Sequence, residues 1–337
     1  MFVVVALLIF GAIILVHEMG HFLAARRVGI EVEEFAIGFG PRLTGFRAAG
    51  TNFSVRLLPL GGYVRMLGEE DNQEVVSEGS YNSKSPLQRM LVIASGPIMN
   101  FLFAVLLFVL IFGVVGLPLN EARIGGVLPG SPAETAGFQP GDVLLEIDSQ
   151  PLSTWVDLQQ AVGNSQGETL SVLVEREGEV ITLSVTPRVS EGHAEIGVSP
   201  ATRRLGILSS IKEGVRQTYE ITVLVLQSLY QIITRQLPAD DLTGPIGIIY
   251  FVGEAARAGL VNVLSLAAII SVNLGLFNLL PIPALDGSKL VFLGIELVRR
   301  RPVDPQKENL VHLVGFALLI SLMVFVMYRD ILRFWVR

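Results

Sequence analysis

Residues 1–27 read MFVVVALLIFGAIILVHEMGHFLAARR, a long apolar run that ends in a polar motif and a pair of arginines. Residues 1–16 carry no charge, and the apolar character continues past His17 to about Ala25. A helix needs about 20 predominantly apolar residues to cross the hydrocarbon of a bilayer. We therefore expect a retained membrane span with polar residues inside it. The alternative, a cleaved signal peptide, is disfavoured because no basic segment precedes the apolar run.

Three further uncharged runs have membrane length: residues 90–120, 258–285 and 309–328. The 337 residues are 51% hydrophobic and 17% charged, whereas an ordinary soluble domain is about 25% charged. This composition argues against a water-soluble enzyme and predicts a polytopic α-helical membrane protein with about four transmembrane helices. A fifth stretch, 221–234, is expected to lie on the membrane surface as an amphipathic helix, with an extra span as the alternative.

Lys and Arg residues predict the orientation of these spans. Arg26, Arg27, Arg89 and the cluster 299–301 fall on one side if there are four spans, and that side should be cytoplasmic. Residues 118–257 would then lie outside. The net charge of −6 provides no basic field for nucleic acid, and the absence of cysteine excludes disulfide and thiolate chemistry.

Two segments differ from the spans. Residues 30–68 contain two alternating runs joined at Ala48–Asn52, which predicts a cytoplasmic-side β-hairpin. Residues 120–200 contain β-like runs separated by turn residues and indicate a water-exposed domain. Its strands are expected at 143–147, 170–175 and 180–185. This domain has 12 acidic and 3 basic residues, a charge of −9, so the rest of the chain sums to +3.

The polar residues of the first helix form the pattern H-E-x-x-H, written His17-Glu18-Met19-Gly20-His21. Residues four apart share a helix face, so the two imidazoles can bind one Zn²⁺ ion. Glu18 is then placed to take a proton from water at the metal. The alternative is a polar helix end that faces water. Because ionisable groups within a span are functional by default, zinc is the preferred interpretation.

Catalytic zinc takes three protein ligands and keeps one position for water. Asp286 is the expected third ligand, because it ends the uncharged run 258–285 at the depth predicted for the two histidines. Pro281 and Pro283 predict bent or extended backbone just before it. The alternative role for Asp286 is a turn-forming Asp-Gly pair.

Three other residues are weaker candidates for the third ligand. Glu296 should form a helix-surface ion pair with Arg299 and Arg300. His312 is a lone histidine in the fourth apolar run, where a packed or interfacial position is expected. His193 lies in the domain predicted outside the membrane, across the bilayer from the motif.

H-E-x-x-H in the first span, followed by N-x-x-P-x-P-x-L-D-G at 278–287, resembles the site-2 protease family of intramembrane zinc metalloproteases. The resemblance covers essentially the whole chain and is greatest to the bacterial RseP-type branch. It implies that His17, His21 and Asp286 bind one Zn²⁺, with Glu18 as base. It further implies that Asn273 and Asn278 line the substrate cleft; the alternative for these two is polar packing between helices.

The same resemblance implies a membrane-entering β-hairpin around Gly38, Gly40 and 53–64 that binds an unwound substrate by strand addition; a hairpin that merely packs is the alternative. It also implies that 118–200 is one extracytoplasmic PDZ domain, on the motifs at 125–133 and 136–142, which accepts a peptide or chain terminus. Some relatives carry two PDZ domains in tandem. The domain as a mere lid is the alternative.

The expected segments are a first transmembrane helix (1–29), a hairpin and loop (30–88), a second transmembrane helix (89–117), the PDZ domain (118–200), a membrane-associated segment (201–257), a third transmembrane segment (258–298), and a loop with the fourth helix (299–337).

The expected activity is that of a zinc metalloendopeptidase of a bacterial inner membrane, with its active site near the cytoplasmic face. Its substrates would be single-pass membrane proteins, such as a pre-trimmed anti-sigma factor, or remnant signal peptides. The alternatives are a non-catalytic membrane PDZ receptor and a metal transporter. A transporter would favour ionisable residues spread along several spans, which these apolar runs nearly lack.

Overall fold

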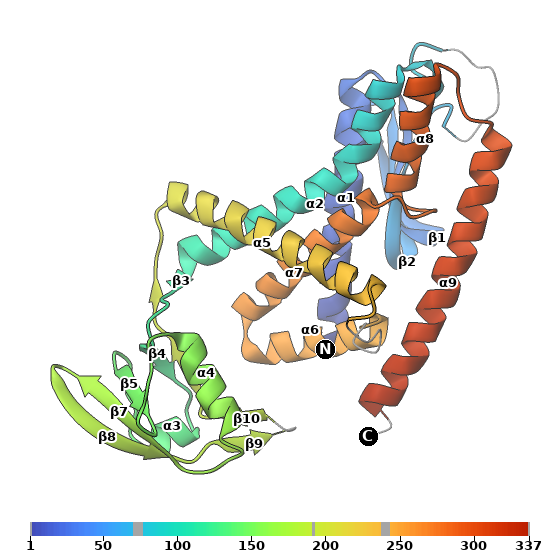
Figure 1. The fold of residues 1–337 in the computed structure, drawn as a ribbon. Helices are drawn as coiled ribbons and strands as arrows, with labels where there is room; N and C mark the ends of the chain where they lie inside the picture. Colours follow the sequence, from blue (N-terminus) through green and yellow to red (C-terminus); the bar gives the residue numbers. More distant parts are fainter. Residues whose placement is uncertain (1, 70–76, 191–192, 237–242, 336–337) are drawn as a thin grey trace. The chain divides into compact units, whose positions relative to one another are not determined.

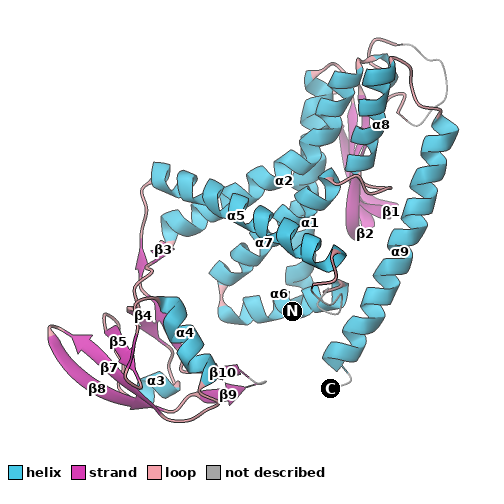
Figure 2. Ribbon diagram, in the orientation of Figure 1, coloured by secondary structure: helices cyan, strands magenta, loops and turns pink. Residues whose placement is uncertain are grey.

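The computed structural model describes residues 2–69, 77–190, 193–236 and 243–335. The chain forms two compact units, one of Met1–Val109 with Ile211–Arg337 and one of Leu110–Ser210. Each unit is described by itself. Helices dominate the first unit and strands the second (Figures 1 and 2).

Within the described residues, four helices of the first unit are long and apolar enough to cross a membrane. They are α1 (Phe2–Arg27), α2 (Pro86–Val114), α7 (Leu260–Leu279) and, over Gln306–Leu332, α9 (Pro305–Trp335). Each contains most of one of the four apolar runs. Helix α1 continues without a break through its polar motif, so the motif lies inside a helix of membrane length.

Strands β1 (Val32–Ala48) and β2 (Thr51–Met66) form the expected antiparallel hairpin. Its turn is made by Ala49 and Gly50, whose φ angles of 48° and 86° suit a two-residue hairpin turn. Both strands are bent, so β1 residues 34–37 pair with 52–55 on one side and with 62–65 on the other. Residues 62–66 therefore form one edge of the sheet.

The hairpin packs against the helices through an apolar cluster that includes Phe22, Phe35, Val64, Ile93 and Leu293. These side chains come from α1, β1, β2, α2 and α8 (Asp286–Arg299). The short 3₁₀ helix η1 (Tyr81–Ser83) leads into α2 and buries Tyr81 in the same cluster. Burial of this cluster fixes the hairpin against the helix that carries the H-E-x-x-H motif.

Two further helices belong mainly to the first unit. Helix α5 (Ile207–Ile233) contains most of the stretch 221–234; it has 27 residues and is not among the four membrane-capable helices. Its expected place on the membrane surface stays a prediction. Helix α6 (Pro245–Ala258) precedes α7, from which Gly259 separates it with a φ of 114°.

The second unit is rich in β-structure. Its four-stranded sheet has the order β6-β5-β7-β8, formed by Gln150–Pro151, Val143–Ile147, Leu170–Arg176 and Glu179–Val185. The three strands expected from the sequence are β5, β7 and β8. The remaining elements are β3 (Leu117–Pro118), β4 (Ile124–Val127), α3 (Pro132–Thr135), α4 (Trp155–Asn164), β9 (Arg188–Ser190), β10 (His193–Glu195), β11 (Val198–Pro200) and β12 (Thr202–Arg203).

This unit has its own apolar core, with Ile124, Phe138, Leu158 and Val174 among its buried side chains. Helix α4 begins with a capping box between Thr154 and Asp157 and buries its apolar face in that core. A separate core is what an independently folded domain requires.

Candidate active site

Helix α1 places both histidines of the motif on its buried face. His17 is 9% and His21 6% exposed. Ionisable side chains are rarely buried in a membrane-capable helix without a partner, so both histidines are expected to have one. Gly20, between them, allows α2 to approach closely, because a Cβ atom there would lie 2.3 Å from the carbonyl oxygen of Ser95. The Ser95 hydroxyl donates a 2.8 Å hydrogen bond to the Gly20 carbonyl and fixes this contact.

A break in the helices brings Asp286 to the same place. Helix α7 ends at Leu279, the prolines lie in irregular backbone as expected, and α8 begins at Asp286. Gly287 is required here, since a Cβ would lie 2.0 Å from the Leu280 carbonyl oxygen. The carboxylate thus stands at the N-terminus of α8, where the helix dipole favours a negative charge.

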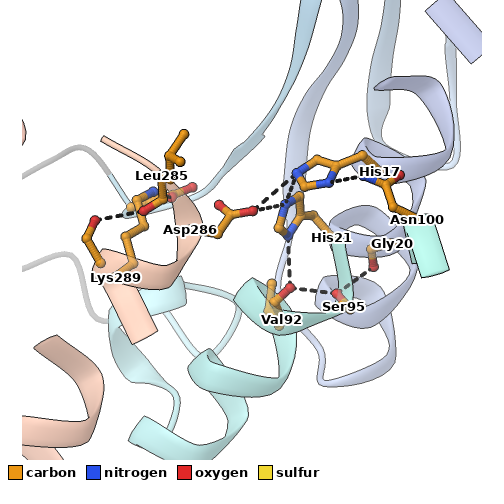
Figure 3. Close-up of polar contacts among 11 residues, drawn as sticks. His17, Gly20, His21, Val92, Ser95, Asn100, Leu285, Asp286 and Lys289 are labelled. Carbon is orange, nitrogen blue, oxygen red and sulfur yellow. Dashed lines mark hydrogen bonds and ion pairs between the residues drawn. The ribbon is translucent and has the colours of Figure 1, made fainter. Parts of the chain in front are cut away.

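The three expected ligands meet at one point (Figure 3). Asp286 Oδ2 lies 3.2 Å from His17 Nε2 and 3.3 Å from His21 Nε2. The two Nε2 atoms are 3.2 Å apart. A tetrahedral zinc ion with ligands about 2.0–2.1 Å away separates any two of them by about 3.3–3.4 Å.

The tautomer of His21 supports the same fit. Its Nδ1 is 2.9 Å from the Val92 carbonyl oxygen, which can only accept, so Nδ1 carries a proton, and in the neutral ring Nε2 then offers its lone pair. His17 is approached on its other side by Asn100, whose amide nitrogen is 3.2 Å from Nδ1. Gly96 also permits the contact, because a Cβ there would lie 2.3 Å from His21 Nε2. Two imidazoles and a carboxylate are a donor set that suits zinc.

Glu18 lies beside this cluster and against the hairpin. A Cβ atom on Gly62 would lie 3.0 Å from Glu18 Cγ and 2.9 Å from the Ala36 carbonyl oxygen. The edge segment 62–66 of the hairpin therefore passes directly along the residue expected to act as base. A peptide bound to this edge would be presented to Glu18.

The structure gives less information on the four residues predicted to bind the substrate. Asn278 is 8% exposed, and Asn273 has a buried Oδ1 without a hydrogen-bond partner. Among the described contacts, neither bonds to the three ligands. Gly38 and Gly40 lie in β1 with φ angles of 89° and 85°, and a Cβ on Gly38 would lie 2.5 Å from the Leu58 carbonyl oxygen. Their substrate role stays a prediction.

The weaker ligand candidates have other partners. Glu296 pairs with Arg89 on α2, so the expected ion pair with Arg299 and Arg300 is wrong: the inward face of α8 brings the carboxylate to another helix. His312 accepts a 3.1 Å hydrogen bond from the backbone N–H of Ala284 and so supports the loop before Asp286. His193 lies in β10 of the second unit.

Sequence analysis missed Asn100, Gly96 and Gly62. A signal for the first was present, because Asn100 is one of few polar residues in the run 90–120, and such residues inside a span usually have a partner. The two glycines gave no comparable signal. Their importance arises from contacts with residues far away in the sequence.

Comparisons with known proteins agree with this chemistry. The family model described as Peptidase family M50 matches residues 5–322. The zinc metalloprotease RasP of Oceanobacillus iheyensis is 32% identical over 98% of this chain and 99% of its own. The regulator of sigma-W protease RasP of Bacillus subtilis is 33% identical over 98% of both chains.

A solved structure similar to part of the chain is the PDZ domain of an SdrC-like protein from Listeria monocytogenes. It covers 25% of this chain and 90% of its own, with 15% identity and a TM-score of 0.22. The single PDZ domain expected at 118–200 stays a prediction.

Proposed function

Because the chain belongs to peptidase family M50 and is a zinc metalloprotease of the site-2 type, we propose that it cleaves single-pass membrane proteins within or near their transmembrane segments. The observation that carries this proposal is the triangle of donor atoms of His17, His21 and Asp286, with sides of 3.2–3.3 Å. Both histidines lie on α1, a helix of membrane length, and Asp286 begins the short helix α8. Family membership also displaces the two alternatives, a non-catalytic PDZ receptor and a metal transporter.

In this proposal His17, His21 and Asp286 hold the zinc ion. Bound there, zinc supplies Lewis-acid polarisation of the scissile carbonyl and an activated water. Glu18 would accept a proton from the attacking water and would donate it to the leaving amine. Glu18 lies against the hairpin at Gly62, where an added Cβ would be 3.0 Å from its Cγ.

The hairpin has a role in presenting the substrate. A transmembrane helix hides its peptide carbonyls in its own hydrogen bonds, so the substrate must unwind before cleavage. Edge segment 62–66, which passes Glu18, can hold an unwound segment by strand addition. Gly38, Gly40, Asn273 and Asn278 are proposed to complete the substrate cleft.

One relative's name, regulator of sigma-W protease, supports the substrate class proposed here. We propose an anti-sigma factor already trimmed by another protease, with remnant signal peptides as further substrates. The unit 110–210 is proposed to be an extracytoplasmic PDZ domain that receives the chain terminus left by trimming. The active site is proposed to lie near the cytoplasmic face of a bacterial inner membrane.

The decisive test uses purified protein, a single-pass reporter and metal analysis. Glu18→Gln should keep stoichiometric zinc and lose cleavage, because it removes the base but no ligand. His17→Ala and Asp286→Ala should lose zinc and activity together. Glu220→Gln, a matched loss of an exposed carboxylate on α5, should behave as wild type. Cleavage by the Glu18→Gln protein would refute the assignment of the base.

A further inference from the structure

Asn100 is a fully buried polar residue that the mechanism above does not use. It lies on α2, is 0% exposed, and turns its amide toward His17 (Figure 3). Its nitrogen is 3.2 Å from His17 Nδ1, and its oxygen is buried without a hydrogen-bond partner. Ser271 on α7 donates a 2.8 Å hydrogen bond to the backbone carbonyl of Asn100, so three helices meet at this residue.

The proposed zinc ligation decides which way this amide must face. If Nε2 of His17 binds zinc, a neutral ring carries its proton on Nδ1. An amide NH₂ group facing that N–H would place two donors 3.2 Å apart. Turning the amide over exchanges oxygen and nitrogen without moving the backbone, and it brings the acceptor oxygen to the ring N–H.

We infer that Asn100 is a positioning residue whose side-chain oxygen accepts the Nδ1 proton of His17 and thereby holds the ring in its zinc-binding tautomer. This inference rests on the proposed ligand set. Under this inference both histidines donate their Nδ1 proton to an oxygen acceptor: His21 donates to the Val92 carbonyl and His17 donates to the Asn100 side chain. Both acceptors come from α2, within eight residues of each other.

A simple packing role does not account for the same observations. Either orientation of the amide leaves one of its buried atoms without a protein partner, which destabilises the folded state. An apolar side chain of the same shape would avoid that cost between two membrane-capable helices. The amide at this position is explained when the histidine ring requires an acceptor.

The test is the zinc affinity of full-length protein in detergent, measured by competition with a chelator. Asn100→Leu keeps the shape and removes the acceptor, so the zinc dissociation constant should rise about 10–100-fold. Asn100→Asp offers only acceptors and should bind zinc at least as tightly as wild type. Asn262→Leu, an exposed position on α7, is the matched control and should leave the affinity unchanged.

Recovery of zinc affinity in Asn100→Asp distinguishes a positioning role from a packing role. The melting temperatures of the zinc-free Asn100→Leu and Asn100→Asp proteins should not follow the order of their zinc affinities. Unchanged affinity of Asn100→Leu, or equal weakening by Leu and Asp, would overturn the inference. If the Leu variant does not fold, Asn100→Ala replaces it. If His17→Ala binds zinc like wild type, the ligand set itself fails; if only the Asn100 variants behave as wild type, the ligand set stands.

Discussion

At the scale of the residue, the site is built by small side chains as much as by ligands. Gly20 and Gly96 allow α1 and α2 to come into contact at the histidines. Gly287 allows the Leu280 carbonyl to lie close to the start of α8, and Gly62 allows the hairpin to pack against Glu18. Each position has too little space for a Cβ atom. A single methyl group added at Gly20, Gly62 or Gly287 should therefore alter catalysis without replacing a ligand, whereas one at Gly96 would collide with His21 Nε2 itself.

Gly62→Ala is expected to lower kcat while zinc remains bound. The added Cβ would approach the Ala36 carbonyl and Glu18 Cγ, so either the strand or the base must move. A displacement of about 1 Å near reacting groups costs up to about 100-fold in rate. Reporter cleavage and zinc content measure the two effects. Gly294→Ala, where a Cβ meets open space, is the control, and equal activity of both variants would contradict the expectation.

Glu34, buried in the hairpin, should make stability depend on pH. Burial raises the pKa of its carboxyl, but hydrogen bonds from Arg56, Ser54 and Tyr63 outweigh burial, and the net pKa is lowered. A lowered folded-state pKa stabilises the protein above the unfolded value, about 4.3, and the effect is lost as pH falls through the folded value.

The stabilisation by ionised Glu34 can be tested by thermal melting in detergent at pH 7 and at pH 3. At pH 7, Glu34→Gln should melt several degrees below wild type, because it removes a charge-assisted network. The difference should shrink in acid as wild type becomes protonated. A difference that is equal at both pH values would show that the charge of Glu34 does not contribute.

At the scale of the element, helices are joined by polar contacts that their sequences do not reveal. The Asp330 carboxylate on α9 is 2% exposed and accepts hydrogen bonds of 3.1 and 2.8 Å from the N–H groups of Gly244 and Gly247. It thus caps the N-terminus of α6, whose cap residue Gly244 has no side chain to do so. A Cβ on Gly244 would lie 2.8 Å from Asp330 Oδ2.

Asp330→Ala should lower the free energy of unfolding by about 1–2 kcal/mol, the usual cost of losing a helix cap. Asp330→Asn keeps one acceptor oxygen and should lose less. Melting of zinc-loaded protein measures both variants, and zinc content should not change because the cap is not a ligand. A larger loss for Asn than for Ala would exclude capping as the cause.

At the scale of the whole molecule, the two units differ in composition as in structure. The net charge of −6 is the sum of an acidic domain near −9 and the remaining chain near +3. Clusters of Arg at the ends of the apolar helices would orient the chain with those ends inside the cell. The unit 110–210 would then be outside.

The absence of cysteine makes this orientation testable with single introduced thiols. Gln160→Cys on α4 and Gln306→Cys on α9 are both exposed positions. A membrane-impermeant maleimide should label Gln160→Cys in intact spheroplasts and Gln306→Cys only after lysis. Labelling in the reverse order would overturn the proposed topology.

Local sequence patterns were enough to predict the main elements and the residues of the candidate site. Apolar runs of membrane length predicted the four membrane-capable helices, alternation predicted the hairpin and strands β5, β7 and β8, and H-E-x-x-H with a distant Asp-Gly predicted the three residues that meet. These features are local, because periodicity and the spacing of ligands on one helix face are written in neighbouring residues.

The surroundings of the ligands emerged only from the packing of the chain. It brought Asn100 to His17, placed Gly62 against Glu18, and paired Glu296 with Arg89 where local spacing had suggested Arg299 and Arg300. These contacts join residues 44 to 207 positions apart in the chain. No local pattern encodes such pairs, because they depend on how closely helix faces approach, and that distance is set by glycines whose role appears only once the helices are packed.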